Sequence, residues 1–260
     1  MDENIYQHFK SNEHDIVDKI ANLIIKAQLN YEPVLTDFFN PREKFIAQSL
    51  IGRYEGIKLA AFGGYHFAER QRVLFYPDYF RYVKQDFKLA LMQINYPEKF
   101  AKLHHGQILG TLANSGIKRD VIGDIITDGC HWQFLTEEKL SNYLKNEITR
   151  IGKINVRLEQ VDMNKLITPI NSWNQQVILL SSLRLDSFIS SAFKISRSKA
   201  KTLVATDFVQ VNWVEVSQAD YQIAKFDIIS VRRYGRIRLD KILGETRKQK
   251  LKAEVSIIKK

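Results

Sequence analysis

Basic residues dominate the last third of this 260-residue chain. Between Ser182 and Lys260 there are 17 Lys and Arg against 8 Asp and Glu, whereas the first 181 residues hold 22 against 21. Nearly all of the formal charge of +10 therefore lies in one region. Because Lys and Arg displace condensed counterions from phosphates, this asymmetry predicts a polyanionic partner, either nucleic acid or an anionic membrane.

Two short helices are expected to carry part of this charge. Leu185, Phe188 and Ile189 share one helical face, and a second helix is expected to begin near Ser196, whose hydroxyl can cap it. Backbone amides and the helix dipole at such an N-terminus already favour phosphate. Five basic residues are predicted on the outer side of the helix pair: Arg184, Lys194, Arg197, Lys199 and Lys201.

A further basic run follows a predicted strand. Phe208 to Val216 alternates apolar and polar residues, and Ile228 to Val231 is typical of another strand that continues into the basic run. Cations and an aromatic ring at every second position would share one strand face, which suits phosphate pairing and base stacking. These residues are Arg232, Tyr234, Arg236 and Arg238, and Arg233 completes the predicted RNA-binding set.

The segment from Ser182 to Arg238 resembles the alpha-L RNA-binding domain. The residues that carry the resemblance are Arg184-Leu185-Asp186, Ser196-Arg197-Ser198-Lys199-Ala200-Lys201, Val209-Gln210-Val211-Asn212 and Asp227-Ile228-Ile229-Ser230-Val231. The resemblance implies that Arg184 and Arg197 contact RNA, although Arg184 could instead pair with Asp186.

Four positions depart from that domain, which usually or often has glycine there. This chain has Asp207, Trp213, Phe226 and Arg233 at these positions. Trp213 is expected to pack in the core or in a turn, in preference to lying exposed as a base-stacking platform.

Residues 1–84 are predicted to form a small α/β domain. Ile16 to Leu29 has the apolar spacing of a helix, and Arg42 to Ile51 is expected to be a second helix with Asn40 as N-cap and Pro41 at its first position. The intervening segment, Tyr31 to Asn40, is predicted to be a loop. Two strands are expected at Leu59 to Phe62 and Val73 to Tyr76.

Residues 85–162 show the element order β-α-β-β-α-β. The expected segments are Leu89–Tyr96, Gly106–Asn114, Val121–Thr127, His131–Leu135, Glu137–Arg150 and Ile154–Val161. This is the order of ferredoxin-like and RNA-recognition-motif folds, whose helices pack on one face of the sheet. The aromatic strand signatures that stack bases are not evident, so a structural role is favoured over RNA contact for this domain.

The remaining segments complete an α+β chain with three small domains. Residues 163–180 are predicted to be a linker that ends in a strand, Val177 to Leu180. The alpha-L domain follows at residues 181–240. Residues 241–260 are expected to be a basic tail, either a mobile phosphate binder or a merely solvated terminus.

Motifs outside the last third extend the resemblance to essentially the whole chain. They are Pro33-Val34-Leu35-Thr36-Asp37-Phe38, Pro41-Arg42-Glu43, Phe62-Gly63-Gly64-Tyr65, Ala68-Glu69-Arg70, Tyr76-Pro77-Asp78-Tyr79, Gly116-Ile117-Lys118-Arg119 and Gly123-Asp124-Ile125. In these motifs the chain is similar to the YlmH family of Gram-positive bacteria. The resemblance implies a non-catalytic, cytoplasmic factor that binds rRNA and tRNA on the large ribosomal subunit and acts in ribosome quality control of stalled nascent chains.

Several other sites and functions find weaker support. A single cysteine, Cys130, excludes an intramolecular disulfide framework and a multi-cysteine metal site, so neither metal nor cofactor is expected. Neither Cys130-His131 nor His104-His105 forms a convincing catalytic or metal-binding constellation. No apolar run approaches the roughly 20 residues of a bilayer span, and no basic segment has a wide apolar helical face, so no membrane partner is expected.

Two alternatives stay open beside the non-catalytic factor. Polar motifs between Thr36 and Asp78 leave room for an RNA-modifying enzyme, similar to a pseudouridine synthase, with its site in the first 160 residues. The near-neutral front half could instead recruit a partner protein, such as a quality-control protein, while the rear half anchors on RNA. The family resemblance connects such a recruitment role with cell division.

Overall fold

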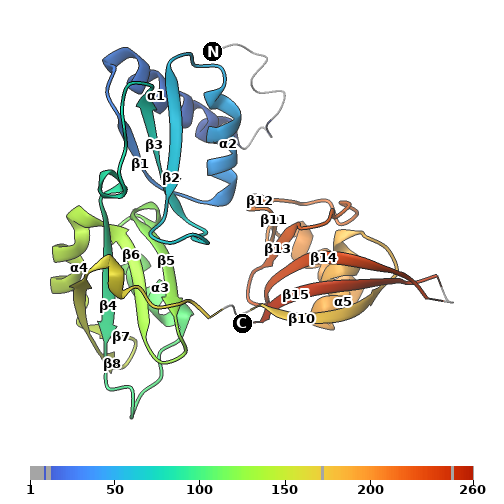
Figure 1. The fold of residues 1–260 in the computed structure, drawn as a ribbon. Coiled ribbons are helices and arrows are strands. Elements are labelled where there is room, and N and C mark those ends of the chain that lie inside the picture. Colours follow the sequence, from blue (N-terminus) through green and yellow to red (C-terminus); the bar gives the residue numbers. More distant parts are fainter. Residues whose placement is uncertain (1–8, 10–12, 171–172, 247–248, 260) are drawn as a thin grey trace. The chain divides into compact units, whose positions relative to one another are not determined.

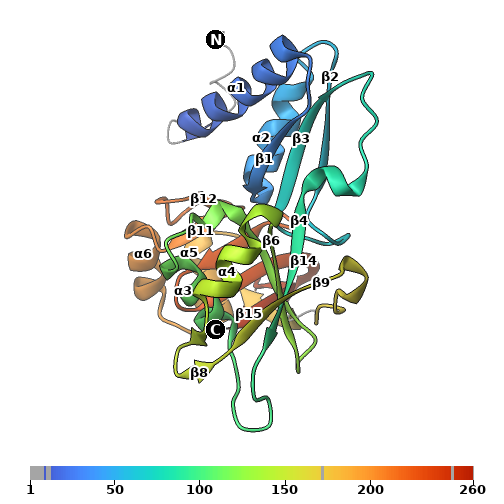
Figure 2. The same ribbon diagram turned by 90° about the vertical axis from the view of Figure 1, so that its left-hand side faces the viewer.

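The computed structural model describes residues 9, 13–170, 173–246 and 249–259, and the chain divides into two compact units, residues 1–170 and 171–260 (Figures 1 and 2). The fold is α+β, as predicted, because helices in both units pack on mainly antiparallel sheets. Each unit has its own apolar core and is described separately below.

The first part of the N-terminal unit packs two helices on a three-stranded sheet. Its elements are α1 His14–Asn30, β1 Val34–Phe39, α2 Pro41–Ile51, β2 Ile57–Phe62 and β3 Gln71–Pro77, with strand order β1-β3-β2. The predicted N-cap of α2 is confirmed: Asn40 Oδ1 accepts from the backbone N–H of Glu43 over 3.0 Å, and Glu43 Oε2 accepts from the backbone N–H of Asn40 over 2.7 Å.

The loop predicted between these helices is wrong, because most of that segment forms strand β1. Polar Thr36 and Asp37 interrupt the apolar pattern, but Thr36 is buried and its Oγ accepts from the backbone N–H of Val73 over 3.0 Å. The register of β1 against β3 also shifts between Leu35 and Phe38. A bulge of this kind breaks the period of two by which a strand is recognised in a sequence.

The second part of the N-terminal unit has the predicted β-α-β-β-α-β order. Its main elements are β4 Leu89–Asn95, α3 His105–Asn114, β5 Ile122–Thr127, β6 Trp132–Glu137, α4 Ser141–Glu147 and β9 Arg157–Val161, with strand order β5-β6-β4-β9. Helix α4 is shorter than the predicted helix Glu137–Arg150, and a two-stranded sheet, β7 Arg150–Ile151 and β8 Ile154–Asn155, follows it. Short 3₁₀ turns occur at Lys84–Phe87, Arg119–Val121, Glu138–Leu140 and Met163–Lys165.

The C-terminal unit packs two helices on one six-stranded sheet. Its elements are β10 Asn174–Leu180, α5 Leu185–Phe193, α6 Arg197–Ala205, β11 Val209–Val211, β12 Val214–Glu215, β13 Ile228–Val231, β14 Gly235–Glu245 and β15 Leu251–Lys259. The strand order is β10-β15-β14-β13-β11-β12. Phe188 of α5 and Val204 of α6 share a core with Ile237 and Leu239 of β14, so the helices cover the Ile237 and Leu239 face of the sheet.

The predicted linker and tail need correction because both contribute strands to this sheet. Strand β10 begins at Asn174, inside the predicted linker, and pairs along its length with β15. Within β15, Ala253, Val255 and Ile257 are buried at every second position, so this part of the tail is a strand of the sheet and not a merely solvated terminus. The lysines around this segment hid its apolar alternation. Arg247, Lys248 and Lys260 lie outside the described residues.

None of the helices in the described residues combines the length and the apolar character that crossing a bilayer would require.

Candidate nucleic-acid interface

A buried carboxylate holds two arginines at the start of the two C-terminal helices. The Asp186 side chain is fully buried in the first turn of α5, while those of Arg184 and Arg197 are 33% and 48% exposed. Arg184 Nε donates to Asp186 Oδ1 over 3.2 Å, and Arg197 Nε donates to Oδ2 over 3.0 Å. A second N–H of each guanidinium bonds the other carboxylate oxygen. Asp186 thus fixes both guanidinium groups as a pair at the surface.

The arginines in turn determine the charge of this carboxylate. Burial raises the pKa of Asp186, but the hydrogen bonds from Arg197 and Arg184 outweigh burial and bring the pKa below its usual value. The hydrogen bond with Asp186 raises the pKa of Arg184. Two guanidinium groups on one carboxylate leave a net positive charge, and each keeps N–H donors that Asp186 does not use.

The predicted helix cap places further cations beside this pair. Ser196 Oγ accepts from the backbone N–H of Lys199 over 3.2 Å, which confirms Ser196 as the N-cap of α6. Lys194, Lys199 and Lys201 are exposed, and Lys194 ends α5 in the left-handed conformation. The start of α6 therefore combines its own positive dipole end with exposed basic side chains.

The predicted single strand from Arg232 to Arg238 is wrong, because the chain turns between β13 and β14. Gly235 pairs with Val231, and Arg233 has a φ of 73°, which makes residues 232–234 a tight turn. Arg232 and Arg233 lie over the ring of Phe208, at 5.2 and 5.7 Å from its centroid. The basic residues of this run consequently do not share one face.

The turn divides the predicted set between two faces of the C-terminal sheet. Tyr234 packs against Phe193 of α5, with Lys199 Nζ 5.7 Å from its ring centroid, and so belongs to the helix side. Arg236 and Arg238 alternate along β14 with buried Ile237 and therefore project on the face opposite the helices. In Figure 1 helix α5 lies behind the strands, so this opposite face is toward the viewer.

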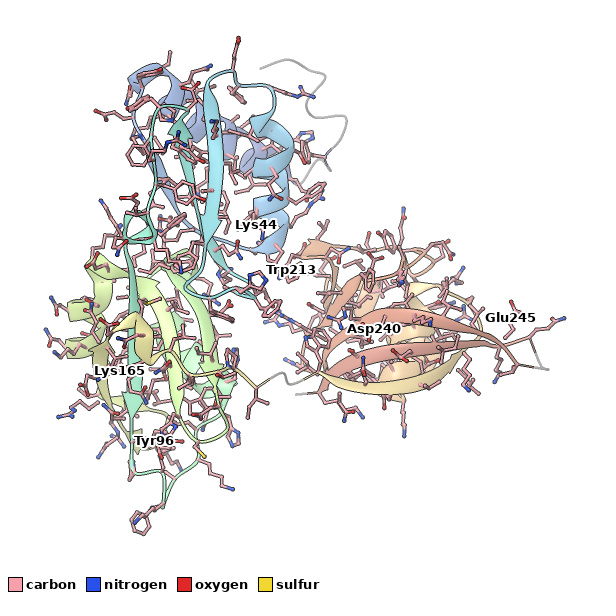
Figure 3. The ribbon with its side chains drawn as sticks, in the orientation of Figure 1. Lys44, Tyr96, Lys165, Trp213, Asp240 and Glu245 are labelled. Atoms are coloured by element: carbon pink, nitrogen blue, oxygen red, sulfur yellow. The ribbon has the colours of Figure 1, made fainter. Side chains whose placement is uncertain are left out.

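A second Arg-Leu-Asp triplet, which the sequence-based prediction missed, directs its Arg238 and Asp240 side chains to that opposite face, while Leu239 lies in the core. Asp240 of β14 is only 9% exposed and accepts from Arg238 Nε and from Ser256 Oγ of β15. The Arg238 guanidinium lies 5.2 Å from the ring centroid of Trp173, which precedes β10. Repetition of Arg-Leu-Asp at residues 184–186 and 238–240 was the available signal in the sequence. Figure 3 labels Asp240 on β14 and Trp213 near the turn after β11.

All four residues that replace glycine adopt the backbone conformation that glycine favours. The φ angles are 57° at Asp207, 66° at Trp213, 70° at Phe226 and 73° at Arg233. The turns therefore keep a left-handed geometry at a steric cost of roughly 1–2 kcal/mol per residue. The strand expected at Val209 is confirmed as β11, but it does not continue unbroken to Val216, because Asn212 and Trp213 form the turn between β11 and β12.

Trp213 lies in this turn and outside the buried core cluster, so the turn alternative of its prediction is confirmed and the core alternative is wrong. Its side chain is half-buried, and the Arg236 guanidinium lies 5.8 Å from its ring centroid. Trp213 is therefore a surface aromatic residue stacked with a cation.

The central sheet is covered on the face where RNA-recognition motifs stack bases. Its helices pack on one face, and on the other Leu91 and Leu135 form a buried cluster with Phe38 of β1. The chain after β9 also closes over this face: Gln133 Oε1 accepts from the backbone N–H of Ile167 over 3.0 Å, and Gln133 Nε2 donates to the carbonyl of Lys165. This face of the central sheet is therefore covered within the N-terminal unit.

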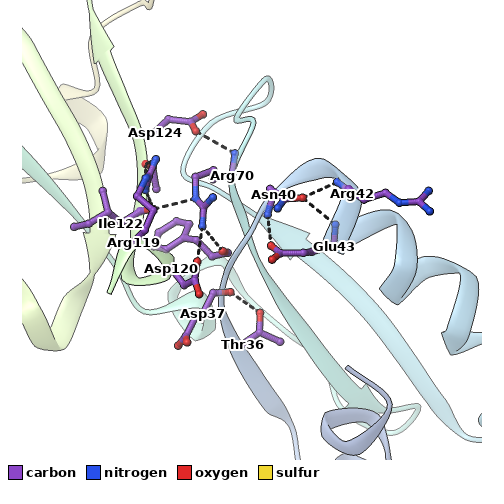
Figure 4. A network of polar contacts seen from close by, with 12 residues as sticks. Thr36, Asp37, Asn40, Arg42, Glu43, Arg70, Arg119, Asp120, Ile122 and Asp124 are labelled. Carbon is purple, nitrogen blue, oxygen red and sulfur yellow. Dashed lines mark hydrogen bonds and ion pairs between the residues drawn. The ribbon is translucent and has the colours of Figure 1, made fainter. Parts of the chain in front are cut away.

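The polar motifs of the N-terminal unit bond to one another between its three-stranded and four-stranded sheets (Figure 4). Asp124 accepts from Tyr65 Oη over 2.8 Å and from the backbone N–H groups of Glu69 and Arg70 over 2.7 and 3.0 Å. The Arg70 guanidinium donates to the carbonyls of Ile122 and Phe38. Burial raises the pKa of Asp124. Residues that motivated the enzyme alternative thus join β1 and the Gly63-to-Arg70 loop to the central sheet.

The candidate pair Cys130 and His131 lies in a turn, whereas His104 and His105 stand at the start of α3. Asp128 Oδ1 accepts from the backbone N–H groups of Cys130 and His131, and Asp128 Oδ2 lies 2.8 Å from His131 Nδ1. The hydrogen bond from His131 lowers the pKa of Asp128 to about 2. Cys130 is exposed in this turn. Among the described residues, no three His, Cys, Asp or Glu side chains are grouped so as to hold a metal ion.

Comparison with known proteins covers most of the chain. The family description "YlmH, N-terminal" matches residues 12–80, and "Putative RNA-binding domain in YlmH" matches residues 83–165. A Bacillus subtilis (strain 168) protein, "Ribosome-associated protein quality control protein P2", is 35% identical over 246 residues, which cover 95% of each chain. The chain belongs to the YlmH family.

A solved structure of a second YlmH-family member agrees with this assignment. This protein, "Cell division protein ylmH from Streptococcus pneumoniae", matches with a TM-score of 0.55 and 35% identity, over 63% of this chain and 99% of the solved one. YlmH membership thus rests on sequence and on fold together.

Proposed function

We propose that this YlmH-family protein is a non-catalytic RNA-binding factor that binds the large ribosomal subunit through rRNA and tRNA. Its role would be ribosome quality control of stalled nascent chains in the cytoplasm. The observation that carries the proposal is the pair Arg184 and Arg197, held at the surface by buried Asp186. The name of the B. subtilis relative supports the ribosome as the partner.

The geometry of this pair suits the phosphate backbone of folded RNA. A guanidinium whose orientation is already fixed loses less conformational freedom on binding a phosphate than a freely rotating one does. Lys199 and Lys201 extend the positive surface along α6, next to the N-terminal end of the helix dipole. Phosphate contacts of this kind position a protein on RNA without requiring a particular base.

Co-sedimentation of the full chain with purified large ribosomal subunits tests the proposal. The double variant Arg184→Glu/Arg197→Glu should lose binding, because it reverses both charges at the site. The matched control Arg53→Glu/Lys58→Glu changes two exposed basic residues of the N-terminal unit and alters the net charge equally, so it should bind as the unmodified chain does. Retained binding by a folded Arg184→Glu/Arg197→Glu variant would overturn the proposal.

Recruitment of a partner protein by the N-terminal unit is a second candidate role. Phe67 and Phe100 are 84% and 90% exposed on loops of this unit, whose charge is nearly balanced. The name of the S. pneumoniae protein supports a connection with cell division. Affinity capture with the full chain and with Phe67→Ala/Phe100→Ala should differ in specific bound proteins; identical capture would remove this candidate.

A further inference from the structure

Two tryptophans and two arginines lie together on the face of the C-terminal sheet opposite the helices. Arg236 and Arg238 are two residues apart on β14 and project from this face. Their guanidinium groups lie over Trp213 and Trp173, at 5.8 and 5.2 Å from the ring centroids. We call these four residues the Arg-Trp face. The chain has only three tryptophans, and two of them are here.

Two buried polar residues orient Arg238, the arginine that lies over Trp173. Ser256 is 1% exposed and donates from Oγ to Asp240 Oδ2, while Asp240 Oδ1 accepts from Arg238 Nε. Arg238 itself remains 33% exposed on its side chain. A buried polar pair therefore holds a partly exposed guanidinium over an indole, which is a more defined arrangement than a solvated surface arginine.

At the other end of the Arg-Trp face, the turn between β11 and β12 holds Trp213 in a sterically unfavourable backbone conformation. Trp213 has a φ of 66°, a conformation that a bulky side chain rarely adopts. The preceding Asn212 donates from Nδ2 to Asp227 Oδ1 over 2.8 Å, and its Oδ1 accepts from the backbone N–H of Ile228 over 2.9 Å. Phe226, next to Asp227, is also left-handed and is 62% exposed, with Lys225 over its ring.

We propose that the Arg-Trp face is a second RNA contact, which stacks unpaired bases on Trp173 and Trp213 while Arg236 and Arg238 bind the adjoining phosphates. Indole rings stack on any base, and guanidinium groups pair with phosphate, so the face fits single-stranded or looped-out nucleotides. A fully paired helix buries its bases and offers nothing to stack on these rings. The inference deepens the proposed function by assigning unpaired nucleotides to one face and backbone phosphates to the other.

Two RNAs separate the faces when each is titrated against the full chain: an oligouridylate and a perfectly paired RNA duplex. The variant Trp173→Ala/Trp213→Gly should bind the oligouridylate at least about tenfold more weakly and bind the duplex unchanged. Glycine at position 213 suits the local φ, so the turn should survive the substitution. Trp173→Phe should retain most of the oligouridylate affinity, because phenylalanine still stacks.

The result distinguishes this inference from the proposed function. Loss of duplex binding in Arg184→Glu/Arg197→Glu, with quenching of tryptophan fluorescence by oligouridylate retained, would support two separate contacts. A different outcome is that Arg184→Glu/Arg197→Glu leaves large-subunit binding unaffected while oligouridylate still quenches tryptophan fluorescence. The proposed function would then have failed, but the Arg-Trp face would still be supported. Unchanged oligouridylate affinity in Trp173→Ala/Trp213→Gly would overturn the inference, as would equal losses for both RNAs.

Discussion

The two Arg-Leu-Asp triplets of the C-terminal unit use the same three residue types in different surroundings. In each, the leucine is fully buried, the aspartate is buried and the arginine side chain is 33% exposed. At the helix start, Asp186 is shared with a second arginine, Arg197. In β14, Asp240 is shared with a serine, and Arg238 lies over an indole. The first triplet presents paired cations, whereas the second presents one cation beside an aromatic ring.

The difference shows that the second group bound to the aspartate determines which ligand the arginine can bind. A second guanidinium at the same carboxylate leaves excess positive charge, which suits a phosphate. A hydroxyl leaves the local charge balanced, and the neighbouring indole then supplies a surface for bases. Arg70 of the N-terminal unit provides a third case: its guanidinium pairs with Asp120 and donates to the carbonyls of Ile122 and Phe38 within the protein.

The largest expected effect concerns Asp124, which holds the backbone of the loop that carries Arg70. Asp124→Ala should lower the free energy of unfolding by about 3 kcal/mol, because it leaves the Tyr65 hydroxyl and the backbone N–H groups of Glu69 and Arg70 without their acceptor. Urea denaturation followed by circular dichroism measures this loss. RNA affinity of the folded variant should be unchanged; a weakened affinity would mean that the network is not purely structural.

The helix-start triplet should respond mainly in RNA binding. Asp186→Asn keeps the side-chain volume but removes the charge that orients both arginines, so affinity for large ribosomal subunits should fall about tenfold. Unfolding free energy should fall by only about 1–2 kcal/mol, since both arginines can turn to solvent. Filter binding and urea denaturation of the same variant test the two parts. Stronger binding, as expected if Asp186 merely neutralised the arginines, would contradict the positioning role.

The fold could be predicted from the sequence wherever the signal was local. Helix α1, the Asn40 and Ser196 caps and the β-α-β-β-α-β order follow from short-range spacing and capping chemistry. Strand β1 was hidden by its bulge, and the β13–β14 turn by arginine at a position where glycine is the usual signal.

The candidate site was predictable in composition but not in arrangement. Every basic residue of the predicted set belongs to the C-terminal unit, yet the turn at residues 232–234 sends them to different faces. The place of strand β15 between β10 and β14 could not be predicted from the sequence, because its partner Gln176 in β10 is remote along the chain. Phe38 covers one face of the central sheet through contacts with Leu91 and Leu135, which are distant in the sequence, so this contact could not be predicted either.

A smaller effect should appear at a strained turn that touches neither triplet. Asp207 is exposed with a φ of 57°, so Asp207→Gly should stabilise the C-terminal unit by roughly 1 kcal/mol. Asp207→Ala keeps the steric penalty and serves as the control. Thermal unfolding should show a higher transition temperature for the glycine variant alone; a lower one would indicate that the Asp207 side chain has an unrecognised stabilising contact.

The smallest expected effect is a difference in pH dependence between Asp186 and Asp124. The pKa of Asp186 is lowered in the folded chain, so its contribution to stability is present above the unfolded value of about 3.9 and is lost as pH falls through the folded pKa. The pKa of Asp124 is raised, so acidification through that pKa favours the folded state at this site. Unfolding curves of Asp186→Asn and Asp124→Asn against pH should deviate from the unmodified chain with opposite slopes; slopes of the same sign would contradict the assignment.

Salt dependence of binding to large ribosomal subunits tests the central claim most directly. For the full chain and for Arg184→Gln/Arg197→Gln, the logarithm of the association constant is measured against the logarithm of salt concentration. If both arginines bind phosphates, the variant should bind more weakly and the magnitude of its slope should fall by about 2, one for each lost contact. An unchanged slope and an unchanged affinity would contradict phosphate binding by this arginine pair.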